Sequence, residues 1–394
     1  MSEHTYTIPF NLNELLNTAE YANASHLKIK KSQYHSELNL YTIKYLKKKL
    51  TTNNIDSLGL MRSVIVKGDK IIGFSPPKSH KFEDLCIPNS IIESFKFEEY
   101  VEGTMINCFY LPEKNHWEIS TRSCITANCT FSSDCNKSFR TMWFEALQTM
   151  GAVDMNKLLN KDYCYSFVLQ HPENRIVVPF KVPNIVLIAI YRIEKDVITK
   201  QNLNSNEFAE LKKHFSIPTP ITPYSTWDEN KKVFSHMEDM KVGVVITHKK
   251  TGQRTKIRNK NYENIRRLKG NSTKLQFQYY SLRKLKKVKD FLNYYPEYND
   301  TFSLMQIQLH KWTTELYQNY IKCFIKKEGT LKDYAFPFRI HMYNLHQIYL
   351  KNLREKKQSI NKRIVINHVN NLDPAALMYL INFKDSHMVC GVTN

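Results

Sequence analysis

The sequence predicts an α+β protein in which antiparallel sheets are followed by a mostly helical region. Apolar runs of strand length, bounded by turn residues, dominate the first 260 residues or so. From Tyr262 onward, apolar residues recur at helical spacing, most clearly at 304–325, 340–353 and 375–380. A chain of 394 residues suits two or three domains. We therefore expect an N-terminal helical and basic segment (1–55), a β-rich domain (56–265) and a helical C-terminal domain (266–394).

The N-terminal segment opens with a helical pattern. Apolar residues at 10–24 fall on one face of a single helix, and Asn13 is its candidate N-cap. Residues 34–49 are mixed and very basic, and they end in three consecutive lysines. A clearer signal follows at 60–74, where two apolar runs flank Lys67-Gly68-Asp69. A glycine-containing turn between two such runs predicts a β-hairpin.

A second hairpin is predicted at 97–123. Apolar runs at 105–111 and 117–119 flank a polar turn at 112–115. Glu102, Gly103 and Thr104 stand where the first strand begins, and a glycine there lets a backbone or a ligand approach closely. An ordinary hairpin with a polar edge explains the same pattern, so these three residues alone leave their role open.

The remaining elements of the β-rich domain follow from period-two and continuous apolar runs. The expected strands are 164–170, 175–180, 184–193, 242–248 and 254–258. Helices are expected at 139–150 and 201–214, and the proline-containing stretch 217–224 is expected to be a loop.

The charge predicts a polyanionic partner. The formal net charge is +20, and residues 241–300 contain sixteen Lys and Arg against four Asp and Glu. Such a concentrated surplus favours contact with the phosphate backbone of a nucleic acid, RNA or DNA, although an AT-rich source also enriches lysine. The candidate RNA-binding residues are Lys249, Lys250, Arg254, Lys260, Arg266 and Arg267. Residues 279–280, 294–295 and Trp312 offer rings for base stacking or for a helical core. His341 and His346 are interpreted as structural.

The cysteines indicate a reducing compartment. The eight cysteines contain no C-x-x-C pair, and the loose cluster of Cys124, Cys129 and Cys135 lacks the spacing of a zinc site. The N-terminus has no signal-peptide pattern, and no apolar run is long enough to span a membrane. We therefore expect free thiols and a cytoplasmic or other intracellular location. The oligomeric state is left open.

Several stretches together resemble the nucleotidyltransferase core of phage-type ATP-dependent RNA ligases. Residues 62–66 (RSVIV), 75–78 (SPPK) and Phe82 resemble the segment before the nucleophile motif of that family. Residues 100–104 (YVEGT) resemble its KxDGS motif, and 165–178 (YSFVLQHPENRIVV) is very similar to its FE…SPxNRIV segment. Residues 242–245 (VGVV) resemble EGVVV, and 256–258 (KIR) resemble the closing KxK motif. The resemblance covers about residues 60 to 265.

The resemblance implies a known chemistry. In that family a lysine attacks the α-phosphate of ATP with Mg²⁺, and the resulting lysyl-AMP passes its AMP to an RNA 5′-phosphate. The implied nucleotide-binding residues here are Glu102, Gly103, Arg122, Glu173, Arg175, Lys256 and Arg258. Glu173 is also the candidate metal ligand. The alternative roles are an ion pair between Glu173 and Arg175, and solvated surface charge for Arg122 and Lys256.

The sequence departs from the family pattern at the reacting position. Tyr100 replaces the nucleophilic lysine, and a phenol with a pKa of about 10 is a poor substitute for an activated amine. Glu102 replaces Asp, Val242 replaces a metal-binding Glu, and Arg258 replaces the second lysine of the last motif. Lys96 lies four residues upstream, too far along the strand to take over.

Two main functional hypotheses remain. The first is an RNA ligase-like protein that acts on or binds RNA ends with a degenerate ATP pocket, using ATP and Mg²⁺ only if it is active. The second is a non-catalytic RNA-binding or scaffold protein derived from a ligase. A noncovalent nucleotidyltransferase is the third alternative. The degenerate motifs and AT-rich composition suit a large DNA virus, which adds a viral replication site to the expected locations.

Overall fold

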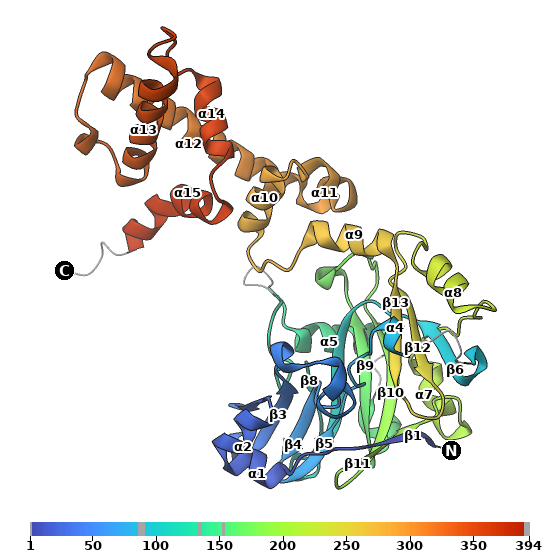
Figure 1. The fold of residues 1–394 in the computed structure, drawn as a ribbon. Helices are drawn as coiled ribbons and strands as arrows, with labels where there is room; N and C mark the ends of the chain where they lie inside the picture. Colours follow the sequence, from blue (N-terminus) through green and yellow to red (C-terminus); the bar gives the residue numbers. More distant parts are fainter. Residues whose placement is uncertain (1, 86–90, 132–135, 152–153, 390–394) are drawn as a thin grey trace. The chain divides into compact units, whose positions relative to one another are not determined.

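The computed structural model describes residues 2–85, 91–131, 136–151 and 154–389, with side chains described as far as residue 383. The chain divides into two compact units, Met1–Arg266 and Arg267–Asn394. The first unit combines antiparallel sheets with flanking helices, and the second is helical, so the predicted α+β class is confirmed (Figure 1). Within the described part, no helix is both long and apolar enough to cross a bilayer.

Three sheets, named A, B and C here, build the first unit, and every pairing of neighbouring strands is antiparallel. Sheet A contains, in spatial order, β1 (Ser2–Thr7), β11 (Val197–Gln201), β10 (Asn184–Glu194), β9 (Tyr163–Gln170), β7 (Thr104–Leu111) and β8 (His116–Ser120). Sheet B contains β2 (Leu27–Lys31), β3 (Leu40–Tyr45), β4 (Val64–Lys67) and β5 (Lys70–Gly73). Sheet C contains β13 (Arg254–Arg258), β12 (Gly243–His248) and β6 (Phe95–Glu99), with β12 central.

Both predicted hairpins are confirmed. Strands β4 and β5 pair through a turn in which Gly68 has a φ of +56°, a left-handed conformation that glycine adopts readily. Strands β7 and β8 pair in the register that places Phe109 opposite Glu118. Strand β7 also pairs with β9, so the second hairpin joins sheet A at one end and β8 forms its edge.

The N-terminal 55 residues depart from the helical expectation because three of the sheet strands lie there. Strand β1 pairs with β11, and β2 and β3 pair with each other. The single helix predicted at 10–24 is two short helices, α1 (Leu12–Asn17) and α2 (Ala19–Ala24). They are separated by Thr18, whose backbone is extended, and Asn11 rather than Asn13 caps α1.

Seven further helices are described in the first unit or begin there. They are α3 (Ile55–Leu58), α4 (Phe82–Leu85), α5 (Phe139–Thr149), α6 (Met155–Leu158), α7 (Ala209–His214), α8 (Trp227–Phe234) and α9 (Lys260–Lys269). Helix α5 confirms the predicted helix at 139–150. It buries Trp143 against Phe167 of sheet A, with the ring centroids 5.3 Å apart. Sheet C has a separate core, in which Trp227 packs against Phe95 and Phe97.

Two predicted elements are wrong. Residues 175–180 form no strand, because the backbone N–H groups of Val177 and Val178 donate to the Glu102 carboxylate instead of to a neighbouring strand. The helix expected at 201–214 begins only at Ala209. Gln201 ends β11, a strand that the sequence did not reveal.

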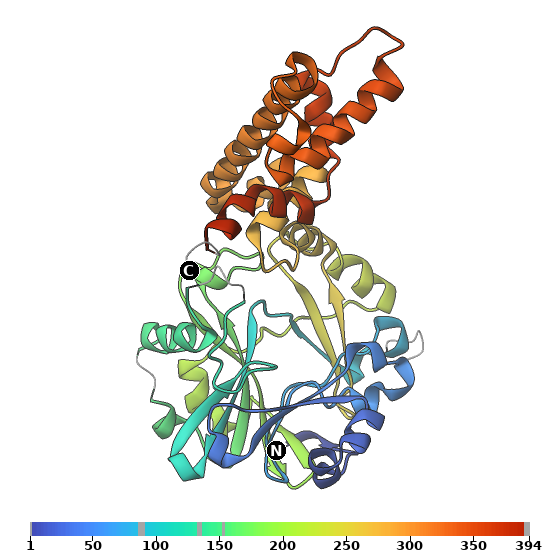
Figure 2. The ribbon, with the colours of Figure 1, turned by 90° about the vertical axis from the view of Figure 1, so that its left-hand side faces the viewer.

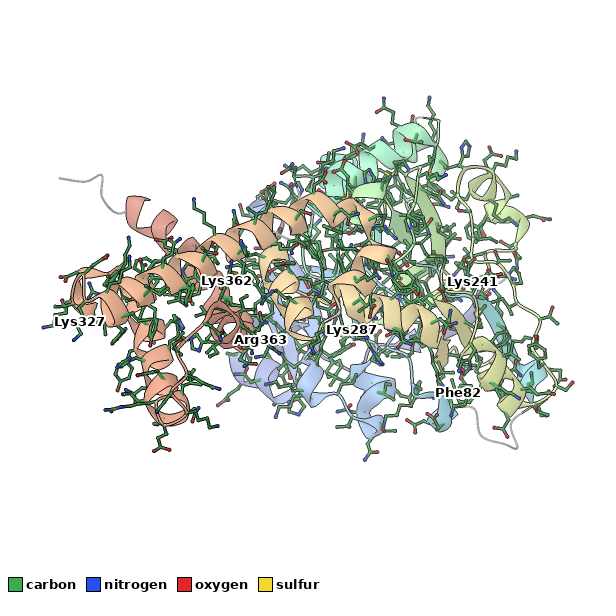
Figure 3. All side chains as sticks on the ribbon, turned by 90° about the horizontal axis from the view of Figure 1, so that it is seen from above. Phe82, Lys241, Lys287, Lys327, Lys362 and Arg363 are labelled. Atoms are coloured by element: carbon green, nitrogen blue, oxygen red, sulfur yellow. The ribbon has the colours of Figure 1, made fainter. Side chains whose placement is uncertain are left out.

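The helical unit packs around aromatic side chains. Its α-helices after α9 are α10 (Leu275–Lys284), α11 (Val288–Tyr294), α12 (Asn299–Tyr320), α13 (Phe336–Ile348), α14 (Lys362–Asn370) and α15 (Pro374–Val389). Phe302 lies 5.0 Å from both Tyr279 and Phe291, measured between ring centroids. Tyr279, Tyr280 and Trp312 are buried, which favours their core role over base stacking. Lys287, Lys327, Lys362 and Arg363 come from different parts of this unit, so its positive charge is spread out (Figure 3).

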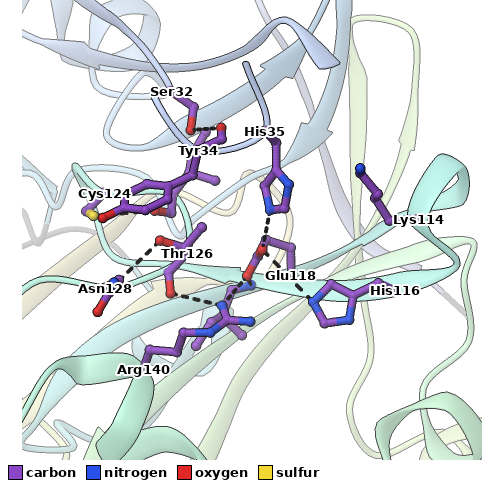
Figure 4. Close-up of polar contacts among 12 residues, drawn as sticks. Ser32, Tyr34, His35, Lys114, His116, Glu118, Cys124, Thr126, Asn128 and Arg140 are labelled. Atoms are coloured by element: carbon purple, nitrogen blue, oxygen red, sulfur yellow. Dashed lines mark hydrogen bonds and ion pairs between the residues drawn. The ribbon is translucent and has the colours of Figure 1, made fainter. Parts of the chain in front are cut away.

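A buried carboxylate ties sheet A to the segments around it (Figure 4). The Glu118 side chain on β8 is only 1% exposed, and its Oε1 accepts a hydrogen bond from Arg140 of α5 at 2.5 Å. Its Oε2 lies 2.8 Å from Nε2 of His35, which precedes β3. Burial alone would raise the pKa of Glu118, but the hydrogen bonds from His35 and Arg140 hold it below its usual value. The contact between His35 and Glu118 therefore joins the segment before β3 of sheet B to sheet A.

We expect Glu118→Gln to lower the free energy of unfolding at pH 7 by about 3 kcal/mol, because it leaves Arg140 without its buried partner. The pKa of Glu118 is lowered in the folded state, so its contribution is present above the unfolded pKa of about 4.3 and is lost as the pH falls below it. Urea denaturation at pH 7 and pH 3 measures both effects.

The control is Glu194→Gln, since Glu194 is 69% exposed in a surface pair with Arg192. This change should stay within about 0.5 kcal/mol of the parent. Equal stabilities of the Glu118→Gln variant and the parent at pH 7 would contradict the assigned role of the buried pair.

Candidate functional site

Tyr100 stands at the centre of the candidate site, directly after β6. Its backbone N–H donates to the carbonyl oxygen of Gly243 on β12 at 3.0 Å, which fixes the residue at the end of sheet C. Its side chain borders a cavity of about 70 Å³ between sheets A and C. The two sheets face each other in Figure 2. The cavity is also lined by Glu98, Met105, Val168, Tyr191, Val245 and Arg254.

Strand β13 brings three cations to this side of sheet C. Arg254, Lys256 and Arg258 alternate with buried residues, so they share one face of the strand. Lys256 Nζ lies 3.4 Å from Tyr100 Oη and 5.2 Å from the centroid of its ring. The guanidinium carbon of Arg258 lies 5.7 Å from the same centroid. Both cations are within range of a cation–π interaction with Tyr100.

Burial and mutual repulsion change the ionisation of this group. Burial, together with the charges of Arg258 and Arg254, lowers the pKa of Lys256 to about 8. Burial alone would raise the pKa of Tyr100, but the charges of Lys256, Arg258 and Arg254 outweigh it and hold that pKa below its usual value. Lys256 therefore loses its proton at a lower pH than an ordinary lysine.

Three more cations complete what we call the cationic cluster. Burial and the charges of Arg254 and Arg122 lower the pKa of Arg62. Burial and the charges of Arg62, Arg258 and Arg254 lower the pKa of Lys78. Arg122 Nε donates to the backbone carbonyl of Arg62 at 3.1 Å. Arg62 and Lys78 were not among the predicted site residues, although the stretches that contain them carried part of the family resemblance. The cationic cluster consists of Arg62, Lys78, Arg122, Arg254, Lys256 and Arg258.

The cationic cluster is poorly neutralised. Across residues 2–85, 91–131, 136–151 and 154–383, only Arg258 of the cluster forms an ion pair with a carboxylate, that of Glu263. The Nε of Arg254 is buried and has no hydrogen-bond partner in that part of the chain. A buried guanidinium nitrogen without a partner is costly, so an anion bound there would be stabilised.

The Glu102 carboxylate has a structural role, because it is already hydrogen-bonded to the backbone. It is 6% exposed, and its Oε1 accepts hydrogen bonds from the backbone N–H groups of Val177 and Val178, both at 3.0 Å. Burial and the hydrogen bond to Glu102 raise the pKa of Tyr262 on α9. Glu102 thus links the start of β7 to the loop after β9 and to α9.

Gly103 is required by the close approach of β9. Its φ is +143°, and a Cβ atom on it would lie 2.4 Å from the carbonyl oxygen of Leu169 and 2.6 Å from the side chain of Val168. Any larger residue would clash there. Gly103 therefore allows β7 and β9 to lie close together. This packing role does not require Gly103 to contact a ligand.

Glu173 and Arg175 each have a partner within the protein. Glu173 Oε1 lies 2.7 Å from Lys137 Nζ, and Arg175 Nε donates to the carbonyl oxygen of Val177 at 2.9 Å. In the part of the chain that the structure describes, no three His, Cys, Asp or Glu side chains are grouped to hold a metal ion. The residues of the cluster therefore do not fit a Mg²⁺ ion held by protein carboxylates.

The predicted RNA-binding residues fall into three groups. Arg254 belongs to the cationic cluster. Lys249 and Lys250 lie in the turn between β12 and β13, where both are exposed. Lys260, Arg266 and Arg267 lie on α9, and Arg266 pairs with Glu263.

Lys96 differs from Lys256 in its partners. Its Nζ lies 2.9 Å from Glu98 and 3.7 Å from Glu3. Burial would lower the pKa of Lys96, but these two carboxylates raise it above its usual value. Lys96 is thus held as an ammonium ion, in keeping with the expectation that it does not replace the missing lysine.

Comparisons with known proteins point to ligases only in part of the chain. No model of a known protein family matches the sequence. A stretch of 107 residues, 26% of the chain, is 29% identical to an RNA ligase of Rhodothermus phage RM378, and the match spans 24% of that protein.

Among solved structures, a putative ATP-dependent DNA ligase from Aquifex aeolicus is 14% identical over 86% of this chain and 80% of its own, with a TM-score of 0.39. An RNA ligase variant from Naegleria gruberi with ATP and Mn is 10% identical over 68% of this chain and 85% of its own, with a TM-score of 0.38. Structural similarity at this level carries no functional weight. The local sequence match and the geometry of the cluster are the stronger observations.

We expect Tyr100→Phe to lower the pKa of Lys256 below about 8, because the Tyr100 hydroxyl raises that pKa. We expect Arg254→Gln to raise the pKa of Lys256, because the change removes a neighbouring positive charge. NMR titration of the labelled lysine side chains measures both shifts. The control Tyr110→Phe removes a hydroxyl that bonds to Asn115 and should leave Lys256 unchanged. An identical Lys256 pKa in all four proteins would contradict the proposed coupling.

Proposed function

We propose that this protein binds RNA ends noncovalently through their phosphate groups at the cationic cluster, and that Tyr100 carries no adenylate. The observation that supports it most is the cluster itself. Five of its six cations, all but Arg122, interact electrostatically with Tyr100, and the cluster has a single carboxylate partner among the described residues. Phosphate groups are the natural counter-ions for such a set of Arg and Lys. The phage relative is named an RNA ligase, which supports RNA as the polyanion.

Of the six cluster cations, Arg254 is the one that lines the cavity of about 70 Å³ beside Tyr100, and the side chains of Glu98 and Glu99 line it too. We therefore place the phosphate at the cationic face of β13. The exposed lysines of the β12–β13 turn and of α9 offer further backbone contacts outside the cavity.

Adenylyl transfer is the second candidate function, and one observation favours it. Lys256 has a pKa of about 8 and no carboxylate partner in the described residues, so a sizeable fraction is an uncharged amine at neutral pH. If ATP is bound, Arg254 and Arg258 are placed to bind its phosphates. Incubation with α-labelled ATP followed by a denaturing gel separates the two functions, because only adenylyl transfer leaves a labelled band.

We expect single-stranded RNA with a 5′-phosphate to bind more tightly than the same RNA with a 5′-hydroxyl. Lys256→Ala should remove most of that difference and reduce the slope of log affinity against log salt concentration by about 1. Fluorescence anisotropy at several salt concentrations measures both quantities. Lys157→Ala, at a side chain that is 87% exposed, is the matched control and should change neither. Equal affinity for both RNAs, or a covalent label on Tyr100, would refute the proposal.

The affinity for 5′-phosphorylated RNA should fall as the pH rises through about 8. The pKa of Lys256 is lowered, so its charge is present below pH 8 or so and is lost above it, and ionisation of Tyr100 adds a negative charge in the same direction. In Lys256→Arg the positive charge persists, so the fall in RNA affinity should move to higher pH. A pH-independent affinity between pH 6.5 and 9 in the parent protein would contradict this assignment.

A further inference from the structure

A second concentration of positive charge lies on sheet B, outside the cationic cluster. Residues 27–49, which contain β2 and β3, hold seven lysines and one acidic residue, Glu37. The Glu37 carboxylate is already paired with Lys114 of the turn before β8, at 3.0 Å. Within the described ranges of the chain, no carboxylate forms an ion pair with any of these seven lysines. The surplus is therefore left without neutralisation by the protein in that part of the chain.

The register of β2 and β3 places three of these lysines on one face of sheet B. Lys28 of β2 lies directly opposite Lys44 of β3, and Lys30 lies opposite Thr42. Residues two apart on a strand, and residues directly opposite on the paired strand, share a face of the sheet. We call Lys28, Lys30 and Lys44 the lysine face. Lys28 and Lys30 are exposed, so a ligand can reach them from solvent.

The lysine face opposes the stability of the sheet that carries it. Like charges directly opposite each other on antiparallel strands destabilise the pairing. Burial, the charge of Arg122 and that of Lys28 lower the pKa of Lys44. A polyanion laid across the face would relieve this repulsion, because phosphate groups are strong partners for clustered lysines.

The loop after β8 connects the lysine face to the cationic cluster. Arg122 Nε donates to the backbone carbonyl of Arg62 at 3.1 Å, and the Arg122 guanidinium carbon lies 5.0 Å from the ring centroid of Tyr45 on β3. The next residue, Ser123, accepts a hydrogen bond from Lys44 Nζ at 2.5 Å. Arg62 belongs to the cationic cluster and Lys44 to the lysine face. The two sets of cations are therefore linked through two consecutive residues.

An exposed aromatic ring lies next to the lysine face. Lys30, Tyr34 and Thr42 line a cavity of about 40 Å³. The Tyr34 side chain is 50% exposed. The following residue, His35, lies 2.8 Å from the buried Glu118 carboxylate, which fixes the segment that carries the Tyr34 ring (Figure 4). An exposed ring beside lysines suits the stacking of an unpaired base.

We propose that the lysine face and Tyr34 form a second RNA contact, which binds the single-stranded segment that follows the terminal phosphate. This inference rests on the proposed binding of RNA ends at the cationic cluster. The lysines contact the phosphate backbone, and Tyr34 stacks on an unpaired base. Neither contact reads the base edges, so the second contact is independent of base sequence. It requires an RNA long enough to extend beyond the cationic cluster.

The first test compares two 5′-phosphorylated single-stranded RNAs, one of about 4 and one of about 20 nucleotides, by fluorescence anisotropy. In the double variant Lys28→Ala with Lys30→Ala, we expect the longer RNA to bind about tenfold more weakly. The slope of log affinity against log salt concentration should fall by about 1 for that RNA. The short RNA should bind the variant and the parent protein equally, because it occupies only the cationic cluster.

The matched control is the double variant Lys70→Ala with Lys157→Ala. It removes the same charge from two exposed lysines, one on β5 at the opposite edge of sheet B and one on α6, and should change neither affinity. Equal affinity of the parent and the Lys28→Ala, Lys30→Ala variant for the longer RNA would overturn this inference. Loss of the preference for a 5′-phosphate, with the effect of the lysines intact, would overturn the proposed function alone.

The second test separates the ring of Tyr34 from its hydroxyl. Tyr34→Phe should keep the affinity for the longer single strand, whereas Tyr34→Ala should lower it about tenfold. A fully paired duplex of the same length should bind both variants equally, because its bases are already stacked on each other. Equal affinities of Tyr34→Ala and Tyr34→Phe for the single strand would overturn the stacking role. Tighter binding of the duplex than of the single strand by the parent protein would overturn the choice of partner.

Urea denaturation shows whether a loss of RNA binding comes from unfolding. The variant with Lys28→Ala and Lys30→Ala should be at least as stable as the parent protein, because it removes the repulsion between Lys28 and Lys44. A lower stability of this variant would contradict the view that these lysines are retained for a ligand.

Discussion

Positive charge held between two sheets is the constraint on which the candidate site depends. Two cations about 5 Å apart repel each other by about 3 kcal/mol at an effective dielectric constant of 20. The fold tolerates several such neighbours because sheet C presents them on one face of β13, and because the Tyr100 ring lies beside two of them. Repulsion within the free protein then becomes a preference for anions, since a bound phosphate relieves it. The lowered pKa of Lys256 reflects its burial first and this repulsion second.

The backbone around Tyr100 is held by contacts that do not involve its side chain. Glu102 holds the loop after β9 through two backbone N–H groups, and Gly103 allows β9 to approach β7 closely. These contacts position strands irrespective of whether position 100 carries an amine or a phenol. The local sequence match to a phage RNA ligase is therefore compatible with a different task at the site.

The sequence predicted those parts of the molecule that depend on local pattern. The two hairpins and β13 follow from alternation and turn residues, and the spacing of Arg254, Lys256 and Arg258 already places them on one face. Strand β1 was missed because its partner β11 lies almost 200 residues away. Strand β11 was missed although it also forms a local hairpin with β10. Residues 175–180 were predicted as a strand because their pattern is apolar. That pattern does not reveal that the Glu102 carboxylate accepts the hydrogen bonds of the Val177 and Val178 N–H groups.

The position of Tyr100 also provides an intrinsic optical signal. Several other tyrosines, among them Tyr6, Tyr163 and Tyr191, have raised pKa values because they are buried. Tyr100 shifts in the opposite direction, so its tyrosinate absorbance emerges at lower pH than theirs. Any anion that neutralises Lys256 and Arg258 must push that absorbance back toward higher pH. Occupancy of the site can therefore be followed by ultraviolet difference spectroscopy, without a label on the protein or on its ligand.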